Sequence, residues 1–244
     1  MDIVDVYVKK IDEFILKYKD ENKISSIQIY LKNNAKIIYG IPMKRLKALF
    51  SKYVDEFNSI DNNDLYNIIN NLFLSFAFEK QVIACMLLEK YINKLHINMA
   101  DLFKNYVEQN IIINWAVSDQ IALNTLSQLN DLSFIYDYAV HENYLLRRTS
   151  TVLFAEKNMT DDDCFMLINV IKLLLQEKEE YVLRGSGWAV RNIYNHNPKI
   201  YFDFLEKYAY KMPRIMLRNA IEMLEESKRM DILITSKEKR DGLK

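Results

Sequence analysis

Two segments, around Trp115 and around Trp188, carry side chains that could take part in catalysis or binding. Trp115 precedes Asp119 by four residues, so on a helix the ring and the carboxylate would lie on one face, one turn apart. The ring face contributes a negative quadrupole and the carboxylate a full charge, so the pair could stabilise a cationic or oxocarbenium-like group. Two ordinary interpretations stay open: a helical Trp is usually part of a core or interface, and a lone Asp is usually a solvated carboxylate or a cap.

Arginine is concentrated in the second half of the chain. Eight of the nine arginines lie at or beyond Arg147, although the formal net charge of the chain is zero. A typical small nucleic-acid-binding protein is basic overall, so this balance counts mildly against that class. A basic stripe on one face stays possible, because arginine suits bidentate contact with phosphate better than lysine does. The alternative is that these arginines lie on solvated helix faces.

The composition predicts a large, ordered and helical chain. Of the 244 residues, 50% are hydrophobic and 27% are charged, which allows a sizeable core and argues against disorder. Only 4 glycines and 3 prolines occur. Sheet proteins need more turn residues than that, whereas helices joined by short polar loops do not.

Several features predict a soluble protein of the cytoplasm. Cys85 and Cys164 each lie among apolar residues, which is typical of buried thiols in a reducing compartment. The cysteines and the three histidines show no metal-ligand spacing, so no metal is expected. The charged, amphipathic N-terminal segment is unlike a signal peptide, and no apolar run is long enough to cross a membrane.

Apolar residues recur at three- and four-residue steps along nearly the whole chain, which predicts about twelve helices. Such short helices cannot bury their faces alone, so they must pair and stack. In the first half, helices are expected over residues 3–18 and 25–38. A third helix is expected to begin after the break at Gly40 and Pro42, a fourth to begin at 61–64, and a fifth to span 79–91. In the second half, start signals occur at Asp131, Asp161, Asn197-Pro198 and Pro213.

No linker rich in Gly, Pro or Ser interrupts the chain, so a single domain over residues 1–244 is expected, with a polar, frayed tail over 236–244. The pattern alone predicts an α-solenoid with a concave face, and many such proteins only bind other proteins. Solenoids with capped ends are commonly monomers, so a monomer is expected.

Short motifs follow one another along the chain at Tyr30-Leu31-Lys32-Asn33, Gly40-Ile41-Pro42-Met43-Lys44-Arg45, Trp115 with Asp119, Leu146-Arg147-Arg148 and Gly187-Trp188-Ala189-Val190-Arg191. In this order and with this spacing they resemble the AlkD-like family of DNA alkylation repair glycosylases. The resemblance covers roughly residues 20–225. No one motif is specific, so the signal lies in their combination.

The resemblance implies an all-α fold: an α-solenoid of HEAT-like antiparallel helix pairs, superhelical with a concave DNA-binding face. It also implies a monofunctional hydrolase, a glycosylase of the DNA-3-methyladenine/7-methylguanine type. Such an enzyme excises positively charged N3- and N7-alkylpurines from double-stranded DNA without base flipping and without a cofactor. It would act in the cytoplasm, associated with the nucleoid when bound to DNA.

Residue roles carry over from the family position by position. The resemblance implies that Asp119 is the catalytic carboxylate. The substrate contacts would come from Trp115, Trp188, Tyr30 and Arg148, and the DNA-backbone contacts from Lys44, Arg45, Arg147, Arg184 and Arg191. Gly185 and Gly187 each cost a helix about 1 kcal/mol relative to alanine, so they could serve close helix packing or the approach of a DNA backbone.

Three positions depart from the family pattern. The family often carries two adjacent Trp residues before the Asp, but Asn114 and Ala116 flank Trp115 here. Glu156 occupies an expected helix position where a basic phosphate contact is typical. These changes could weaken DNA binding or alter the choice of lesion. The alternatives to a glycosylase are a catalytically silent relative that binds DNA and a protein-interaction scaffold.

Overall fold

The computed structural model describes residues 2–242, and the regular structure in that range is helical apart from one isolated β-bridge between Ile37 and Ala77. The all-α expectation is confirmed. Fourteen α-helices are present in the described residues, more than expected, because α8 and α13, of 6 and 7 residues, are too short to show a clear period. The α-helices are α1 (Ile3–Tyr18), α2 (Glu21–Tyr30), α3 (Met43–Phe50), α4 (Asn62–Leu74), α5 (Phe78–Leu95), α6 (Met99–Glu108), α7 (Trp115–Asn124), α8 (Phe134–Ala139), α9 (Tyr144–Val152), α10 (Asp161–Leu173), α11 (Glu180–His196), α12 (Pro198–Tyr208), α13 (Arg214–Ala220) and α14 (Glu226–Asp241), and two short 3-10 helices are η1 (Val54–Phe57) and η2 (Leu126–Gln128).

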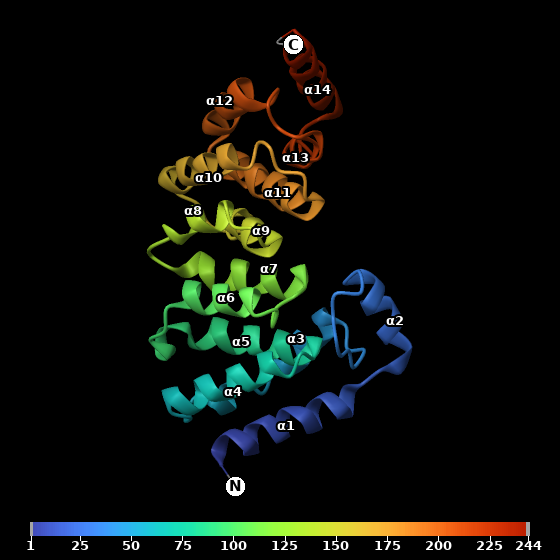
Figure 1. The fold of residues 1–244 in the computed structure, drawn as a ribbon, viewed down its shortest axis with the longest axis vertical. Coiled ribbons are helices and arrows are strands. Elements are labelled where there is room, and N and C mark those ends of the chain that lie inside the picture. The colour runs from blue at the N-terminus through green and yellow to red at the C-terminus, as the bar shows by residue number, and fades with distance from the viewer. Residues whose placement is uncertain (1, 243–244) are drawn as a thin grey trace. The chain divides into compact units, whose positions relative to one another are not determined.

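The helices group into two compact units, Met1–Thr125 and Leu126–Lys244. In the first unit, α5 packs against α3, α4 and α7, while α1 lies along α4 (Figure 1). The Asp61 carboxylate accepts hydrogen bonds from the backbone N–H groups of Asn63 and Asp64 and so caps α4, which confirms the helix start predicted at 61–64. The apolar residues that recur at three- and four-residue steps on this helix are all buried: Leu65, Ile68, Ile69, Leu72 and Phe73.

The second helix begins and ends earlier than its apolar pattern predicts. A helix over 25–38 was expected, but α2 spans Glu21–Tyr30. The Asp20 side chain caps its start. Lys32 and Asn33 then adopt left-handed backbone conformations, with φ of 50° and 62°, which a right-handed helix cannot accommodate. The apolar residues beyond that turn belong to a loop and not to the helix.

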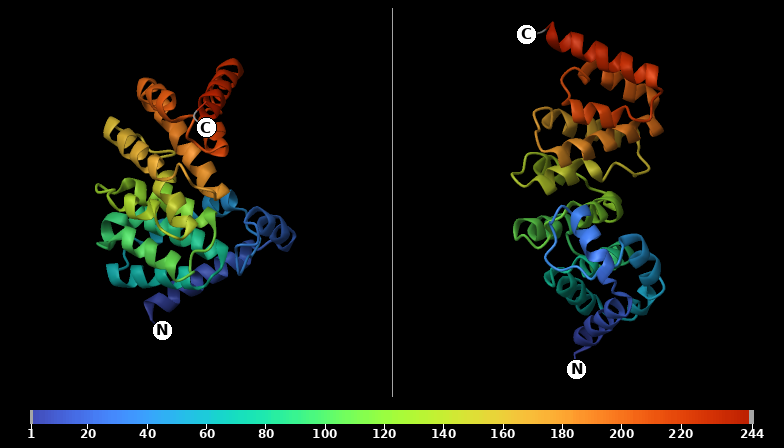
Figure 2. Two further views of the ribbon diagram at one scale, coloured as in Figure 1. Left: turned by 45° about the horizontal axis from the view of Figure 1, so that its top comes forward. Right: turned by 90° about the vertical axis from the view of Figure 1, so that its right-hand side faces the viewer.

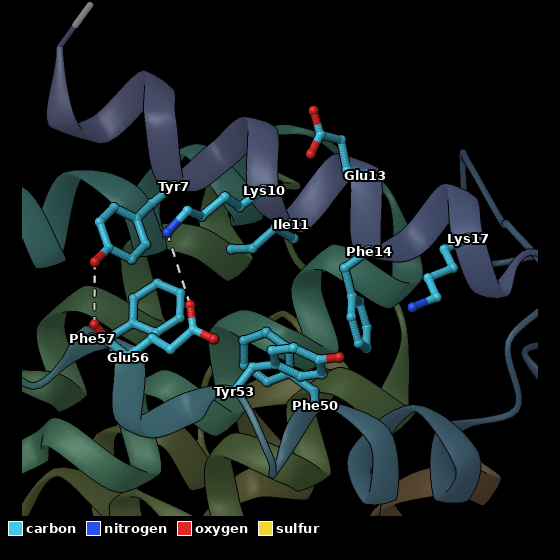
Figure 3. A pocket seen from close by; sticks show the side chains of 10 residues that line it. All are labelled: Tyr7, Lys10, Ile11, Glu13, Phe14, Lys17, Phe50, Tyr53, Glu56 and Phe57. Carbon is cyan, nitrogen blue, oxygen red and sulfur yellow. Dashed lines mark hydrogen bonds and ion pairs between the residues drawn. The ribbon is translucent and has the colours of Figure 1, made fainter.

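Helix α1 leaves a pocket of about 260 Å³ against α3 and η1 (Figure 3). Aromatic rings line it from both sides, and the ring centroids of Tyr7 and Phe57 lie 4.9 Å apart. At its rim the Lys10 ammonium lies 3.9 Å from the Glu56 carboxylate. Tilted ring pairs of this kind stabilise a structure beyond the area that they bury, so they hold α1 onto the first unit.

In the second unit, α11 packs against α9, α10, α12 and α13 (Figure 1). Three predicted helix starts are confirmed here. The fourth start signal, at Asp131, does not coincide with a helix start but lies shortly before α8, which begins at Phe134. The confirmed starts are α10 at Asp161, behind a capping box of Thr160 and Asp163, α12 at Pro198, capped by Asn197, and α13 directly after Pro213.

Gly185 and Gly187 let α11 lie very close to its neighbours. A methyl group added at Gly185 would lie 2.8 Å from the Arg148 Nη1 atom of α9. A methyl group added at Gly187 would lie 2.5 Å from the backbone oxygen of Met216 in α13. Of the two roles expected for these glycines, the contacts within the second unit support close helix packing.

We expect Gly187→Ala to lower the free energy of unfolding. Alanine gains about 1 kcal/mol of helix propensity, but its methyl group would meet α13 backbone that cannot rotate away, and overpacking costs about 1–3 kcal/mol. Urea denaturation followed by circular dichroism should therefore show a net loss of about 1 kcal/mol. Gly242→Ala is the matched control, since its methyl group would make an ordinary 3.4 Å contact with the Glu238 oxygen. A Gly187→Ala variant as stable as this control would contradict the close-packing account.

The C-terminal segment is helical to Asp241, whereas a frayed tail from Ser236 was expected. Helix α14 diverges from α12 (Figure 2), and hydrogen bonds from arginine hold it to the chain before α13. The Arg240 guanidinium donates to the backbone oxygens of Tyr210 and Met212, both at 2.8 Å, and Ser236 is buried. The prediction of a frayed tail from the polar composition of this segment was therefore wrong, because an arginine can anchor a helix by donating hydrogen bonds to backbone carbonyl groups, even where the helix has no apolar face. Residues 243–244 lie outside the described range.

Both cysteines are buried, as their apolar neighbours predicted. Burial raises the pKa of the Cys164 thiol to about 11 and also raises that of Cys85. A thiol that stays protonated is a poor nucleophile, so packing explains both residues. Within residues 2–242, no helix combines the length and the apolar character needed to cross a membrane.

Candidate functional site

Helix α7 carries Trp115 and Asp119 on successive turns, as their spacing predicted. The helix begins at Trp115 because the Asn114 side chain caps it, accepting a 3.0 Å hydrogen bond from the backbone N–H of Val117. The Trp115 ring is half-buried, and Asp119 is only 5% exposed. A carboxylate with so little contact with water interacts more strongly with a nearby positive charge than a solvated one does.

Tyr30, at the end of α2, joins this pair. Its ring centroid lies 4.9 Å from that of Trp115, with the planes tilted by 60°, and the residue is 51% exposed. The structure therefore brings together three of the site residues predicted in the first unit: two rings that touch, and a buried carboxylate on the same helix as one of those rings. We call Tyr30, Trp115 and Asp119 the aromatic–carboxylate set.

The departures beside Trp115 serve the local structure. Asn114 is 1% exposed and caps α7, while Ala116 is 2% exposed and lies in the core. A second large ring at position 116 would require different packing in the first unit. The aromatic surface of α7 is therefore the single ring of Trp115.

The start of α3 presents cationic side chains. Lys44 and Arg45 are exposed in its first turn. Cations are electrostatically unfavourable at a helix N-terminus, so helix stability does not explain them. The Lys47 ammonium donates a hydrogen bond to the side-chain oxygen of Gln120, the residue next to Asp119. This contact joins α3 to the helix that carries the catalytic candidate.

A residue that was not predicted, Glu79, lies in the first turn of α5 and is fully buried. Its carboxylate accepts hydrogen bonds of 3.0, 2.8 and 3.0 Å from the backbone N–H groups of Tyr39, Gly40 and Ile41. Burial raises the pKa of the Glu79 carboxyl, and the hydrogen bonds from the loop partly oppose that rise. The sequence did contain a signal for the burial of Glu79: it lies four residues before Ile83, so both residues lie on the buried face of α5.

In the second unit, Arg147 is tied to the protein itself. Its Nε atom lies 2.6 Å from Glu177 Oε2, and its Nη1 atom donates to the backbone oxygens of His141 and Glu142 at 2.8 and 2.6 Å. Burial acts to raise the pKa of the Glu177 carboxyl, but the Arg147 hydrogen bond and two backbone N–H groups outweigh it and hold that pKa below its usual range. Arg147 therefore clamps the segment before α9 to the segment before α11.

Arg148, predicted as a substrate contact, is 6% exposed and donates a hydrogen bond to the backbone oxygen of Tyr181. Trp188 is half-buried on α11. The two predicted phosphate contacts on that helix pair with carboxylates: Arg184 Nη2 lies 2.7 Å from Glu180 Oε1, and Arg191 forms an ion pair with Glu222. Arg184 keeps 58% of its side chain exposed, so its pairing is a weak surface contact.

Glu156 does not lie on a helix, which corrects the expectation for this departure. It is exposed in the bend that follows α9 (Tyr144–Val152). The helix ends early because the residues after Val152 turn with 3-10-type hydrogen bonds, from the N–H of Phe154 to the oxygen of Thr151 and from the N–H of Ala155 to that of Val152. Within residues 2–242, no group of three or more His, Cys, Asp or Glu side chains could hold a metal ion.

These features define an all-helical repeat protein that carries the aromatic–carboxylate set on α2 and α7 and arginines on other helices. The sequence matches the family model for the DNA alkylation repair enzyme over residues 11–224. The chain belongs to the DNA alkylation repair enzyme family, and so to DNA repair.

A solved structure from Enterococcus faecalis, described as a "Predicted DNA alkylation repair enzyme", has the same fold. It is 20% identical in sequence, with a TM-score of 0.72, and the similarity covers 85% of this chain and 97% of that chain. None of the curated proteins matches the sequence. Every candidate site residue, from Tyr30 to Arg191, lies within the range of the family match, whereas α14 lies beyond it.

Proposed function

We propose that the protein is a monofunctional DNA glycosylase that hydrolyses the N-glycosidic bond of positively charged N3- and N7-alkylpurines in duplex DNA. The observation that carries this proposal is the buried Asp119 carboxylate one helical turn from the Trp115 ring, which the Tyr30 ring contacts. Membership of the DNA alkylation repair enzyme family places the protein in DNA repair. The protein acts as a monomer in the cytoplasm, at the nucleoid, and needs no cofactor.

The charge of the lesion makes the chemistry possible with one carboxylate. An N3- or N7-alkylpurine is already cationic, so when the bond from C1′ to the base breaks, the base takes the electron pair and leaves neutral. The enzyme then needs no general acid. The Asp119 carboxylate stabilises the deoxyribose oxocarbenium ion and orients the water that adds to C1′, and the proton of that water passes to solvent.

The aromatic rings pack against the deoxyribose and add to the negative potential around it. Trp115, Tyr30 and Trp188 take this part, with Arg148 as a further substrate contact, and the base is not drawn into a deep pocket, unlike the flipped bases of most glycosylases. Phosphate contacts position the duplex without reading its sequence. They come from Lys44, Arg45, Arg147, Arg184 and Arg191.

The experiment that tests the proposal is release of 7-methylguanine from methylated duplex DNA, measured beside release of uracil from a matched duplex. We expect release of the cationic base and no release of uracil, since uracil is neutral and would need an acid. Release of uracil would contradict the argument from leaving-group charge. If neither base were released, the proposed glycosylase activity would be refuted.

A second candidate is a catalytically silent relative, either one that still binds DNA or one that serves as a protein-interaction scaffold, and the pairing of three predicted phosphate contacts with carboxylates favours the scaffold. Arg147, Arg184 and Arg191 each face a carboxylate, which reduces the positive charge available to DNA. Salt dependence separates the forms of this alternative. Affinity for DNA falls steeply as salt rises, through counterion release, whereas a protein scaffold need not bind DNA at all.

A further inference from the structure

We infer that Glu79 is a positioning residue for DNA binding: its buried carboxylate fixes the loop 39–41 and so sets where α3 presents Lys44 and Arg45. The inference rests on the proposed function, in which these two residues contact DNA phosphates. Glu79 itself lies too deep to touch DNA, because it is fully buried.

The loop needs an acceptor at this point. Residues 39–41 belong to no helix or strand, so no regular structure satisfies their backbone N–H groups. The two carboxylate oxygens of Glu79 accept all three: Oε2 from Tyr39, and Oε1 from Gly40 and Ile41. A buried carboxylate is costly unless it is hydrogen-bonded. Here it is hydrogen-bonded three times and lies in the first turn of α5, where the helix dipole also favours negative charge.

The loop is held from its other side as well. The backbone N–H of Asp20, just before α2, donates a 3.1 Å hydrogen bond to the Tyr39 oxygen. Gly40 has φ of +87°, and an added methyl group there would lie 1.9 Å from the Asp20 oxygen. The loop therefore lies between the start of α2 and the start of α5, with no free space on the Asp20 side.

The position of this loop determines the position of the cations. Only Ile41 and Pro42 separate Gly40 from α3, which begins at Met43. Ile41 is fully buried, and the ring of Pro42 restricts its φ, which is −55°. A shift of the loop is consequently passed to the first turn of α3, where Lys44 and Arg45 lie, because neither intervening residue can absorb it.

The test uses Glu79→Gln and the matched control Glu89→Gln, which removes the same charge from an exposed position on the same helix. In Glu79→Gln, one loop N–H faces an amide NH₂ in place of an acceptor. We expect the slope of log affinity against log salt, for an undamaged DNA duplex, to become shallower by up to about 2, because each lost phosphate contact removes about 0.9. Glu89→Gln should keep the parent slope. Glu79→Asp, which keeps the charge but withdraws it by one methylene, should fall between parent and Glu79→Gln.

The same substitution in a Lys44→Ala/Arg45→Ala background separates positioning from general damage. There we expect Glu79→Gln to cause no further change in slope, because the contacts that it misplaces are already gone. An equal loss in both backgrounds would overturn the inference and leave the proposed function intact. If the parent protein did not bind DNA, both the inference about Glu79 and the proposed function would be refuted.

A measurement without DNA tests the anchoring step alone. Hydrogen exchange of the Gly40 and Ile41 amides should be faster in Glu79→Gln than in the parent, with the amides of α13 unchanged. Unchanged exchange at Gly40 and Ile41 would show that the carboxylate does not hold the loop, and would overturn the inference whatever the DNA result.

Discussion

Asp119→Asn should slow the release of 7-methylguanine from methylated duplex DNA by roughly 100- to 1,000-fold, which is the range seen when one preorganised electrostatic group is removed. Asparagine keeps the shape of aspartate but loses the negative charge that opposes the developing oxocarbenium ion. The loss is large because Asp119 is only 5% exposed, so little water is present to take over its role. Single-turnover release at saturating enzyme measures this step without product dissociation.

The same substitution should leave DNA affinity intact or slightly raised, since it removes a negative charge from a surface that meets phosphates. Fluorescence anisotropy on a labelled duplex measures this separately. Asp137→Asn is the control for the charge change, because Asp137 is exposed on α8 and outside the candidate site. If Asp119→Asn released the base as fast as the parent, the mechanism would be refuted, whatever the fold.

Gly40→Ala should destabilise the fold more than Gly187→Ala does, because strain and overpacking act together at this position. The residue has φ of +87°, where an L-residue with a side chain is strained, at a cost of about 1–2 kcal/mol. Its methyl group would also lie 1.9 Å from the Asp20 backbone oxygen, and overpacking adds about 1–3 kcal/mol. We therefore expect the free energy of unfolding to fall by about 3 kcal/mol. Urea denaturation followed by circular dichroism measures it.

Gly242→Ala is again the control, because Gly242 has φ of −74°, a conformation open to any residue. A folded Gly40→Ala variant should also bind DNA less tightly than the parent, since the displaced loop leads directly into α3. Parent-like stability in Gly40→Ala would show that the loop can move away from Asp20 without cost. The rigid link from Glu79 to Lys44 and Arg45 would then fail as well.

Local features of the sequence determined much of the fold, and the residues concerned show why. The start signals at Asp61, Asp161 and Asn197-Pro198 act within one turn of their own helix, so the identity of these residues is enough to place a helix start. The spacing of Trp115 and Asp119 could be interpreted in the same way, because helical geometry alone puts residues four apart on one face. The end of α2 was predicted wrongly, since the left-handed turn at Lys32 and Asn33 overrides an apolar pattern that continues beyond it.

Which charged residues are exposed depends on the packing of segments that are distant in the sequence. Arg147, Arg148 and Glu79 resemble surface residues in the sequence, yet each is held by groups more than 25 positions away: Glu177, Tyr181 and the loop 39–41. The pairing of Tyr30 with Trp115 and the helix at 236–241 are of the same kind. A charge can be buried wherever distant segments supply its partners, and those partners cannot be identified from spacing along the chain. Most helices, several of their caps and the aromatic–carboxylate spacing could thus be predicted from local sequence, whereas packing decided which side chains meet.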